Sequence, residues 1–135
     1  MTNSRAKGAR GERQAAAAVA SHLHCTAARG VQYQGGKDSP DIQTDLAGIH
    51  FEVKRCERGC VHSWMEQSQR DAGRNIPTVL HRKNNTEWLL TVKLEDMYAL
   101  AKQLLEKAIT AEVASLATGQ VPADVPRTDL PAANG

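Results

Sequence analysis

The sequence predicts one α/β domain in which a mixed β-sheet is flanked by helices. The chain has 135 residues, which is long enough to bury a core without disulfides or a structural metal. Stretches with helical periodicity alternate with stretches whose side chains alternate as in strands. The predicted order is helix, three strands, helix, two strands and helix (αβββαββα), and this order is typical of an α/β fold.

The first predicted helix covers residues 12–23 and follows a basic arm at residues 1–10. It contains four consecutive alanines, the residue type with the highest helix propensity. A carboxylate heads its apolar stripe and would point toward the interior or a cleft. Placement of this acid in the first helical turn, against the helix dipole, explains it equally well. The stripe consists of Glu12, Ala16, Val19 and Leu23.

Residues 30–40 read as a glycine-rich loop, with a short strand at 31–33. Two further strands are predicted at residues 41–45 and 49–55, joined as a hairpin by a turn. The second alternates cleanly, so its odd and even positions face opposite sides of the sheet. The apolar side carries Ile49, Phe51 and Val53, and the polar side carries His50, Glu52 and Lys54.

The second half of the domain is predicted to hold two helices and two strands. The helices cover residues 61–74 and 94–109, and the strands cover residues 78–81 and 88–92 on either side of a turn. The inward stripe of the first of these helices is Val61, Trp64, Met65, Ser68 and Ala72. The last helix has a broad apolar face of Leu94, Met97, Tyr98, Leu100, Ala101, Leu104, Leu105 and Ala108. The domain is therefore expected to end near residue 114, before a disordered tail at residues 115–135.

Charge and composition narrow the classes of function. The net charge is only +2, but the first thirteen residues carry four cations against one acid. Such an arm suits a polyanion such as nucleic acid, and a solvated terminus is an equal alternative. No apolar run approaches a membrane span, and no secretory signal is visible. Three cysteines, an odd number, argue against a disulfide framework and indicate a cytoplasmic protein.

The residues that indicate chemistry lie on the two strands of the predicted hairpin. Glu52 and Lys54 are two apart, so both leave the same face of their strand. Asp41 begins the neighbouring strand, where Pro40 stiffens the backbone, and its carboxylate can reach Glu52. Carboxylates at close range bind Mg²⁺, and a lysine beside them can hold water and offset negative charge. This set predicts metal-dependent hydrolysis of a phosphodiester.

The spacing of Pro40-Asp41 and Glu52-Val53-Lys54 resembles the PD-(D/E)xK nuclease superfamily. The surroundings resemble its Holliday-junction-resolvase-like branch, in particular small phage-type endonucleases. The resemblance covers roughly residues 5–105 and rests on both the motif and its context. It implies a restriction-endonuclease-like core. The matching segments are 10–13, 35–41, 51–55, 64–67, 79–82 and the strand of Trp88.

The resemblance also implies roles for individual residues. Asp41 and Glu52 would ligate Mg²⁺ or Mn²⁺, together with the Val53 carbonyl, and Glu12 would be a further acid of the metal site. Lys54 would position or activate water. Gln67 would orient Lys54 or the substrate phosphate, although Gln69 is a rival. The residues expected to contact DNA phosphates are Arg5, Lys7, Arg10, Arg13, Lys37, Arg55 and Arg82.

Several alternatives stay open at this point. Asp38 or Asp45 could replace Asp41 if the register of the strand differs. A zinc site is disfavoured because no CxxC pair is present and a fourth ligand at standard spacing is missing. The residues weighed for it are Cys25, Cys56, Cys60, His22, His24 and His62.

The favoured function is a metal-dependent DNA endonuclease, and the first hypothesis for its substrate is branched DNA, as for a four-way-junction resolvase; no sequence feature separates it from the second. Such an enzyme would act as a homodimer, because two symmetric nicks need two active sites. A restriction-like, repair or replication nuclease would share the fold and the chemistry. A non-catalytic nucleic-acid-binding protein with this fold is the alternative from another class. An unrelated α/β binding module would make the whole constellation a coincidence.

Overall fold

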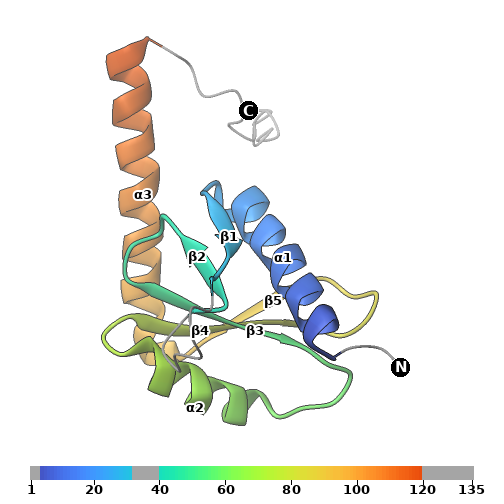
Figure 1. Cartoon of the computed structure of the whole chain (residues 1–135). Coiled ribbons are helices and arrows are strands. Elements are labelled where there is room, and N and C mark those ends of the chain that lie inside the picture. The colour runs from blue at the N-terminus through green and yellow to red at the C-terminus, as the bar shows by residue number, and fades with distance from the viewer. Residues whose placement is uncertain (1–3, 32–39, 120–135) are drawn as a thin grey trace, which may run out of the picture.

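The computed structural model describes residues 4–31 and 40–119. It is a mixed α/β fold, as predicted, with a three-stranded sheet, a two-stranded sheet and three α-helices among those residues (Figure 1). None of the helices in these residues is long and apolar enough to cross a membrane. The predicted contacts of Lys37 and the alternative Asp38 lie outside the described residues, as do most of the predicted strand at 31–33 and the end of the tail.

Helix α1 (Ser4–Leu23) begins eight residues before its predicted start at 12, so most of the predicted basic arm is helical. Arginine, lysine and alanine dominate this first part of the helix, and all three favour the helical state. Gly11 is buried in this helix against Arg55, and a Cβ there would make only an ordinary contact with the arginine side chain. On the predicted stripe Ala16 and Val19 are buried.

The predicted hairpin of residues 41–45 and 49–55 does not form. Strand β2 (Ile42–Thr44) pairs instead with β1 (Ala27–Arg29), in an antiparallel two-stranded sheet. Hydrogen bonds at the two ends of this pair hold it: Thr26 bonds to Asp45, and the N–H of Gly30 donates to the carbonyl of Asp41 at 2.9 Å. Local alternation therefore predicted β2 roughly but not its partner, and strand β1 was not predicted.

The three-stranded sheet has the order β3-β4-β5 and is mixed. Strand β3 (Ile49–Arg55) runs parallel to β4 (Ile76–Arg82), and β5 (Leu89–Val92) is antiparallel to β4. Helix α2 (Val61–Ala72) makes the crossover that a parallel pair needs. It ends two residues early, at Gly73, whose positive φ of 58° suits glycine.

The faces of β3 follow the predicted alternation. Ile49 and Phe51 join the hydrophobic core under α1, while Lys54 reaches α2 on the other side. Polar bonds tie α2 to the sheet, since Ser68 donates to the carbonyl of Thr78. The main hydrophobic cluster of the core consists of Ala15, Ala16, Val19, Ile42, Leu46, Ile49, Phe51, Leu80 and Leu100.

Helix α3 (Met97–Thr118) follows a short 3₁₀ turn (η1, Leu94–Asp96) and continues past its predicted end at 109. The predicted domain boundary at 114 thus falls inside this helix. Its broad apolar face is not buried as a whole, because Leu100 is its only buried residue. The far half of α3 extends beyond the body of the molecule (Figure 1).

Candidate active site

Asp41 lies beside the outer edge of β3. Its Oδ2 accepts a hydrogen bond of 2.8 Å from the backbone N–H of Val53. Because β3 is an edge strand of its sheet, the groups on its outer edge need partners other than a neighbouring strand. The carboxylate of Asp41 is the partner of the Val53 N–H. This hydrogen bond places Asp41 beside the residue between Glu52 and Lys54, although the two strands do not form a hairpin.

A close contact between two backbone segments holds Asp41 in this place. A Cβ on Gly30 would lie 1.9 Å from the carbonyl oxygen of Pro40. No side chain can be accommodated there, because the obstacle is backbone. Glycine at position 30 therefore allows the end of β1 to pack directly against the residues that lead into β2.

Glu52, Lys54 and Gln67 form a connected polar chain across β3 and α2. The Lys54 Nζ lies 3.3 Å from Glu52 Oε1 and donates a hydrogen bond of 2.8 Å to Gln67 Oε1. Glu52 is only 5% exposed, so its carboxylate is held in a poorly solvated place. Gln69, the rival of Gln67, is exposed. The structure thus brings Gln67 to Lys54, and Gln69 does not take this position.

His50 belongs to the same cluster, and sequence reasoning gave it no role. Its Nε2 lies 3.6 Å from Glu52 Oε2, which is too long for a hydrogen bond but close enough for an electrostatic contact. The ring is buried, and Nε2 has no hydrogen-bond partner among the described residues. Strand alternation contained the signal, because His50 shares a face with Glu52 and Lys54.

Glu12 approaches the site from α1. Its carboxylate pairs with the Arg29 guanidinium, which comes from β1. A cleft of about 250 Å³ lies between the start of α1 and the end of β3, and it is lined by Ser4, Lys7, Gly8, Gly11, Glu12, Val53 and Arg55. Glu12 is therefore near the site, on the wall of this cleft, and an arginine that the sequence analysis did not single out offsets part of its charge.

The buried carboxylates respond differently to their surroundings. Burial raises the pKa of Asp41 to about 6, and the nearby charges of Glu52 and Glu12 add to this, against the hydrogen bond from Val53. Burial also raises the pKa of Glu52, but its contacts with His50 and Lys54 outweigh burial and hold the pKa below its ordinary value. The pair thus carries its negative charge first on Glu52, and the charge of Asp41 is costly until a cation offsets it.

The donor set fits a hard divalent cation. Asp41 and Glu52 offer carboxylate oxygens, and the Val53 carbonyl is a further oxygen on the same strand. In the described part of the chain no group of three or more histidine, cysteine, aspartate or glutamate side chains is arranged to hold a metal. Mg²⁺ suits a site with few carboxylates, because it usually retains several waters.

Two of the predicted phosphate contacts are linked through a residue that sequence reasoning missed. The Gln14 side-chain oxygen accepts a hydrogen bond of 2.8 Å from Arg55 and another of 2.8 Å from Arg82. The Arg82 guanidinium also lies over the Trp88 ring, 4.6 Å from its centroid. These contacts fix both arginines between α1 and the carboxyl ends of β3 and β4. Of the predicted N-terminal cations, four lie exposed on α1: Arg5, Lys7, Arg10 and Arg13.

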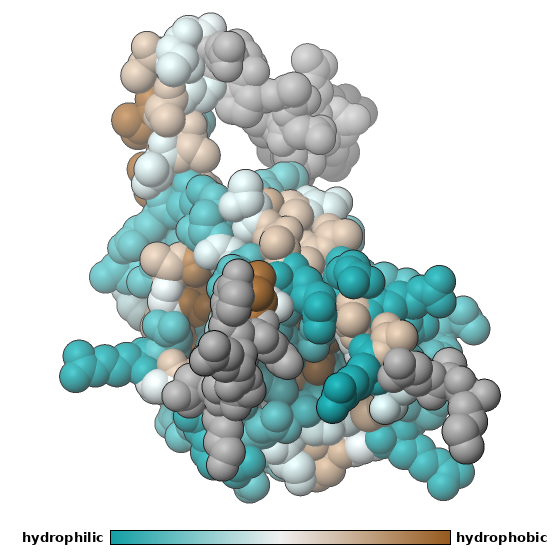
Figure 2. Space-filling model, viewed as in Figure 1, coloured by the Kyte–Doolittle hydropathy of each residue, from teal (hydrophilic) through white to brown (hydrophobic). Residues whose placement is uncertain are grey.

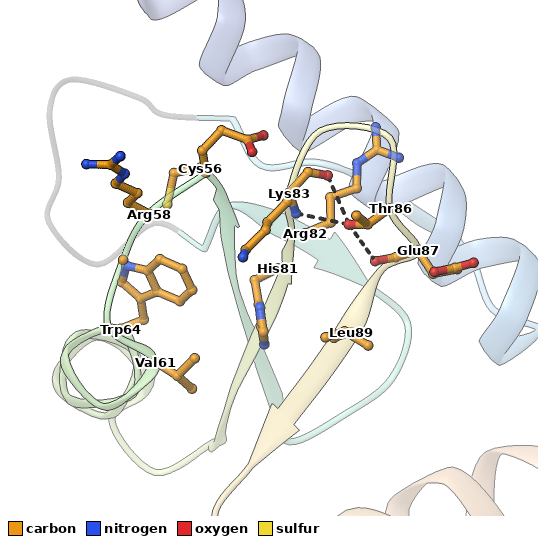
Figure 3. Close-up of a pocket in the computed structure, with 12 residues that line it drawn as sticks. Cys56, Arg58, Val61, Trp64, His81, Arg82, Lys83, Thr86, Glu87 and Leu89 are labelled. Atoms are coloured by element: carbon orange, nitrogen blue, oxygen red, sulfur yellow. Dashed lines mark hydrogen bonds between the residues drawn. The ribbon is translucent and has the colours of Figure 1, made fainter.

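A larger pocket, of about 560 Å³, lies beyond the carboxyl ends of β3 and β4, and none of the predicted metal ligands lines it (Figure 3). Trp64 reaches into it from α2, with its ring centroid 5.5 Å from that of His81. The cationic residues at its margin are Arg58, Arg82 and Lys83. Trp64 lies three residues before Gln67 on α2, but neither Gln67 nor Lys54 lines this pocket.

The three cysteines are unpaired in the structure. Cys56 and Cys60 are exposed in and near the loop between β3 and α2, and Cys25 is half-buried after α1. Cys25 is thus distant in the chain and in its packing from the other two. No family model, curated protein or solved structure matches this chain.

Proposed function

We propose that this protein is a Mg²⁺-dependent endonuclease that hydrolyses DNA phosphodiester bonds. The observation that carries the proposal is the convergence of Asp41 on the strand of Glu52 and Lys54. Three separate segments contribute to it: the residues before β2, strand β3, and helix α2 with Gln67. If these charges merely faced water on a surface hairpin, Glu52 would not be buried in contact with Lys54, and Lys54 would not be hydrogen-bonded to Gln67.

Each side chain has a role that its contacts support. Asp41, Glu52 and the Val53 carbonyl would hold Mg²⁺, which supplies charge neutralisation at the phosphate and lowers the pKa of bound water. Lys54, which Gln67 orients at 2.8 Å, can hold the attacking water and offset charge on the phosphate. Glu12, paired with Arg29, is a neighbouring acid that raises the electrostatic cost of leaving Asp41 without a cation.

The substrate path is supported by the positive charge near the site. Lys7 and Arg55 line the cleft beside Val53, and these cations would contact phosphates without reading sequence. Arg58 and Lys83 border the larger pocket beyond the carboxyl ends of β3 and β4 (Figure 3). An unpaired or distorted strand could enter there, which favours branched DNA over uniform duplex as the substrate.

The mixed α/β fold is compatible with a restriction-endonuclease-like core, and that core and membership of the PD-(D/E)xK superfamily are part of this proposal. The four-way-junction specificity is the more particular hypothesis. Restriction-like or repair nucleases would use the same residues. A homodimer would place two such sites on one substrate.

The test is cleavage of labelled four-way junction, flap, linear duplex and single-stranded DNA with and without Mg²⁺. Asp41→Asn and Lys54→Ala should each lower the cleavage rate by at least 100-fold while DNA affinity changes little. Lys107→Ala, which removes a lysine of α3 that pairs with Asp45, is the matched control. Cleavage that survives a chelator or both site variants would exclude the mechanism. Binding without cleavage by the unaltered protein, with Mg²⁺ or Mn²⁺, would favour the non-catalytic alternative, and equal cutting of all substrates would exclude the resolvase.

A further inference from the structure

Helix α3 carries large apolar side chains that no other described element covers. Tyr98 is 83% exposed and Leu116 is 78% exposed, while Leu105, Ile109 and Val113 are 59%, 50% and 60% exposed. Hydrophobic residues show on the projecting part of this helix (Figure 2). A contiguous apolar patch of this size is within the range of the largest patches on monomers, and patches of that size are often functional. We call Tyr98, Leu105, Ile109, Val113 and Leu116 the α3 stripe.

The α3 stripe is separate from the face by which α3 attaches to the body. Leu100 is buried, Leu104 packs against the core, and Lys107 pairs with Asp45 at 2.6 Å. With 3.6 residues per turn, Tyr98 and Leu100 point about 160° apart around the helix axis. The helix thus has two apolar faces, and the body of the protein uses only one of them.

Four of the five residues of the α3 stripe are spaced symmetrically along the helix, and Val113 lies about 60° to one side of them. Tyr98, Leu105, Ile109 and Leu116 are separated by seven, four and seven residues. On a helix these intervals keep all four within about 20° of one line. The spacing reads the same in both directions, with its midpoint at residue 107. A second helix laid antiparallel on the first would therefore place large apolar residues against large apolar residues.

We propose that the α3 stripe is the interface of a two-fold dimer in which the α3 helices of two copies pack antiparallel. Tyr98 of one copy would lie against Leu116 of the other, and Leu105 against Ile109. Such an interface is isologous, as in the commonest type of protein dimer. This inference does not depend on the nuclease chemistry, but it would give the proposed enzyme two active sites.

The size of the stripe is consistent with a dimer. The exposed fractions of its five side chains add up to roughly three fully exposed large residues, which is on the order of 500 Å² per copy. A standard interface buries about 800 Å² per partner, and the small flanking residues and helix backbone would add to the stripe. Ala101 and Ala108 lie on one flank of the stripe, where they allow two helices to approach closely.

Sedimentation equilibrium of the full chain from 1 to 100 µM tests the proposal. The unaltered protein should be a dimer in this range. Leu105→Glu/Ile109→Glu should weaken association by at least 100-fold, because each glutamate then faces another glutamate. The control Thr110→Glu changes an exposed residue on another side of the same helix and should leave the dimer intact. Circular dichroism checks that every variant stays folded.

A charge-pair variant tests the antiparallel register. In Leu105→Glu/Ile109→Lys each glutamate would face a lysine of the other copy, so association should recover at least 10-fold relative to the double-glutamate variant. A parallel pair would face like charges and would not recover, which would overturn the register. A monomeric unaltered protein at 100 µM, or a dimer that the double-glutamate variant leaves intact, would overturn the interface. In the first result the stripe would serve residues 120–135 or another protein instead. None of these results depends on whether the protein cuts DNA.

Discussion

The carboxylate of Asp41 and the backbone of Val53 are joined by a hydrogen bond of 2.8 Å. This bond connects the two-stranded and three-stranded sheets at the point where the candidate metal ligands meet. It also leaves the Asp41 carboxylate poorly solvated, next to Glu52 and Glu12, with a raised pKa. The site therefore stores an electrostatic cost in its metal-free state, and the following predictions start from it.

Asp41→Asn should stabilise the metal-free protein at neutral pH. The pKa of Asp41 in the folded state, about 6, exceeds its ordinary value. The protonated carboxyl therefore contributes fully to the free energy of unfolding below about pH 4, and this contribution is lost as the pH rises through 6. Asparagine keeps the hydrogen bond from Val53 without the charge. We expect the free energy of unfolding of the variant to exceed that of the unaltered protein by about 1–2 kcal/mol at pH 8, and by little at pH 4.

Urea unfolding at both pH values, in a chelator, measures this difference. Asp45→Asn is a control of opposite sign, because the hydrogen bond with Lys107 lowers the pKa of Asp45. Its stabilisation is present at neutral pH and lost as the pH falls through the folded pKa, so the variant should be the less stable protein at pH 8. Added Mg²⁺ should raise the stability of the unaltered protein and leave Asp41→Asn unchanged. If Asp41→Asn were less stable at pH 8 than the unaltered protein, that result would contradict this account of Asp41.

Gln67→Ala should slow cleavage, whereas Gln69→Ala should not. Gln67 accepts the hydrogen bond that orients Lys54, and Gln69 is exposed on the same helix. Loss of one orienting contact should lower kcat by about 10–100-fold with a smaller change in KM, since the charge of Lys54 is retained. Single-turnover cleavage with saturating protein measures the step directly. Equal rates for both variants would remove Gln67 from the site.

Gly30→Ala should damage both the fold and the site. The added Cβ would lie 1.9 Å from the Pro40 carbonyl oxygen, so the backbone before Asp41 must move. We expect a loss of about 2–4 kcal/mol in the free energy of unfolding and a lower affinity for Mg²⁺. Gly8→Ala is the matched control, because nothing lies within 4 Å of its added Cβ. That exposed helical position should gain about 0.5–1 kcal/mol. Similar effects of the two substitutions would argue against the close contact.

Lys7→Ala should weaken DNA binding in a salt-dependent way. Lys7 is exposed on the wall of the cleft that contains Val53 and Arg55. Removing one phosphate contact should reduce the slope of log K against log salt by about 1. Arg74→Ala removes another exposed cation, at the opposite end of the parallel strands, and should leave the slope unchanged. Fluorescence anisotropy over a range of salt concentrations, in a chelator, distinguishes the two. An unchanged slope in Lys7→Ala would place the DNA elsewhere.

Local sequence patterns determined much of this protein. The two-residue period placed Glu52 and Lys54 on one face of β3, and the apolar period of α2 brought Ser68 and Ala72 into the core. These features depend on neighbours in the chain, so periodicity reveals them.

Tertiary structure decided the partners. β2 pairs with β1, and β3 pairs with β4. Alternation along the chain could not predict these pairings, because it says little about which strand's backbone a given strand will hydrogen-bond with. Asp41 thus reaches Val53 by a route that alternation could not reveal, and Gln67 rather than Gln69 meets Lys54. In α3 the same apolar composition supplies both a buried Leu100 and an exposed Tyr98. The hydrophobicity of a residue shows that its side chain favours burial. Only the arrangement of the whole fold decides whether, and by which surface, it is covered, because the hydrophobic effect has no direction.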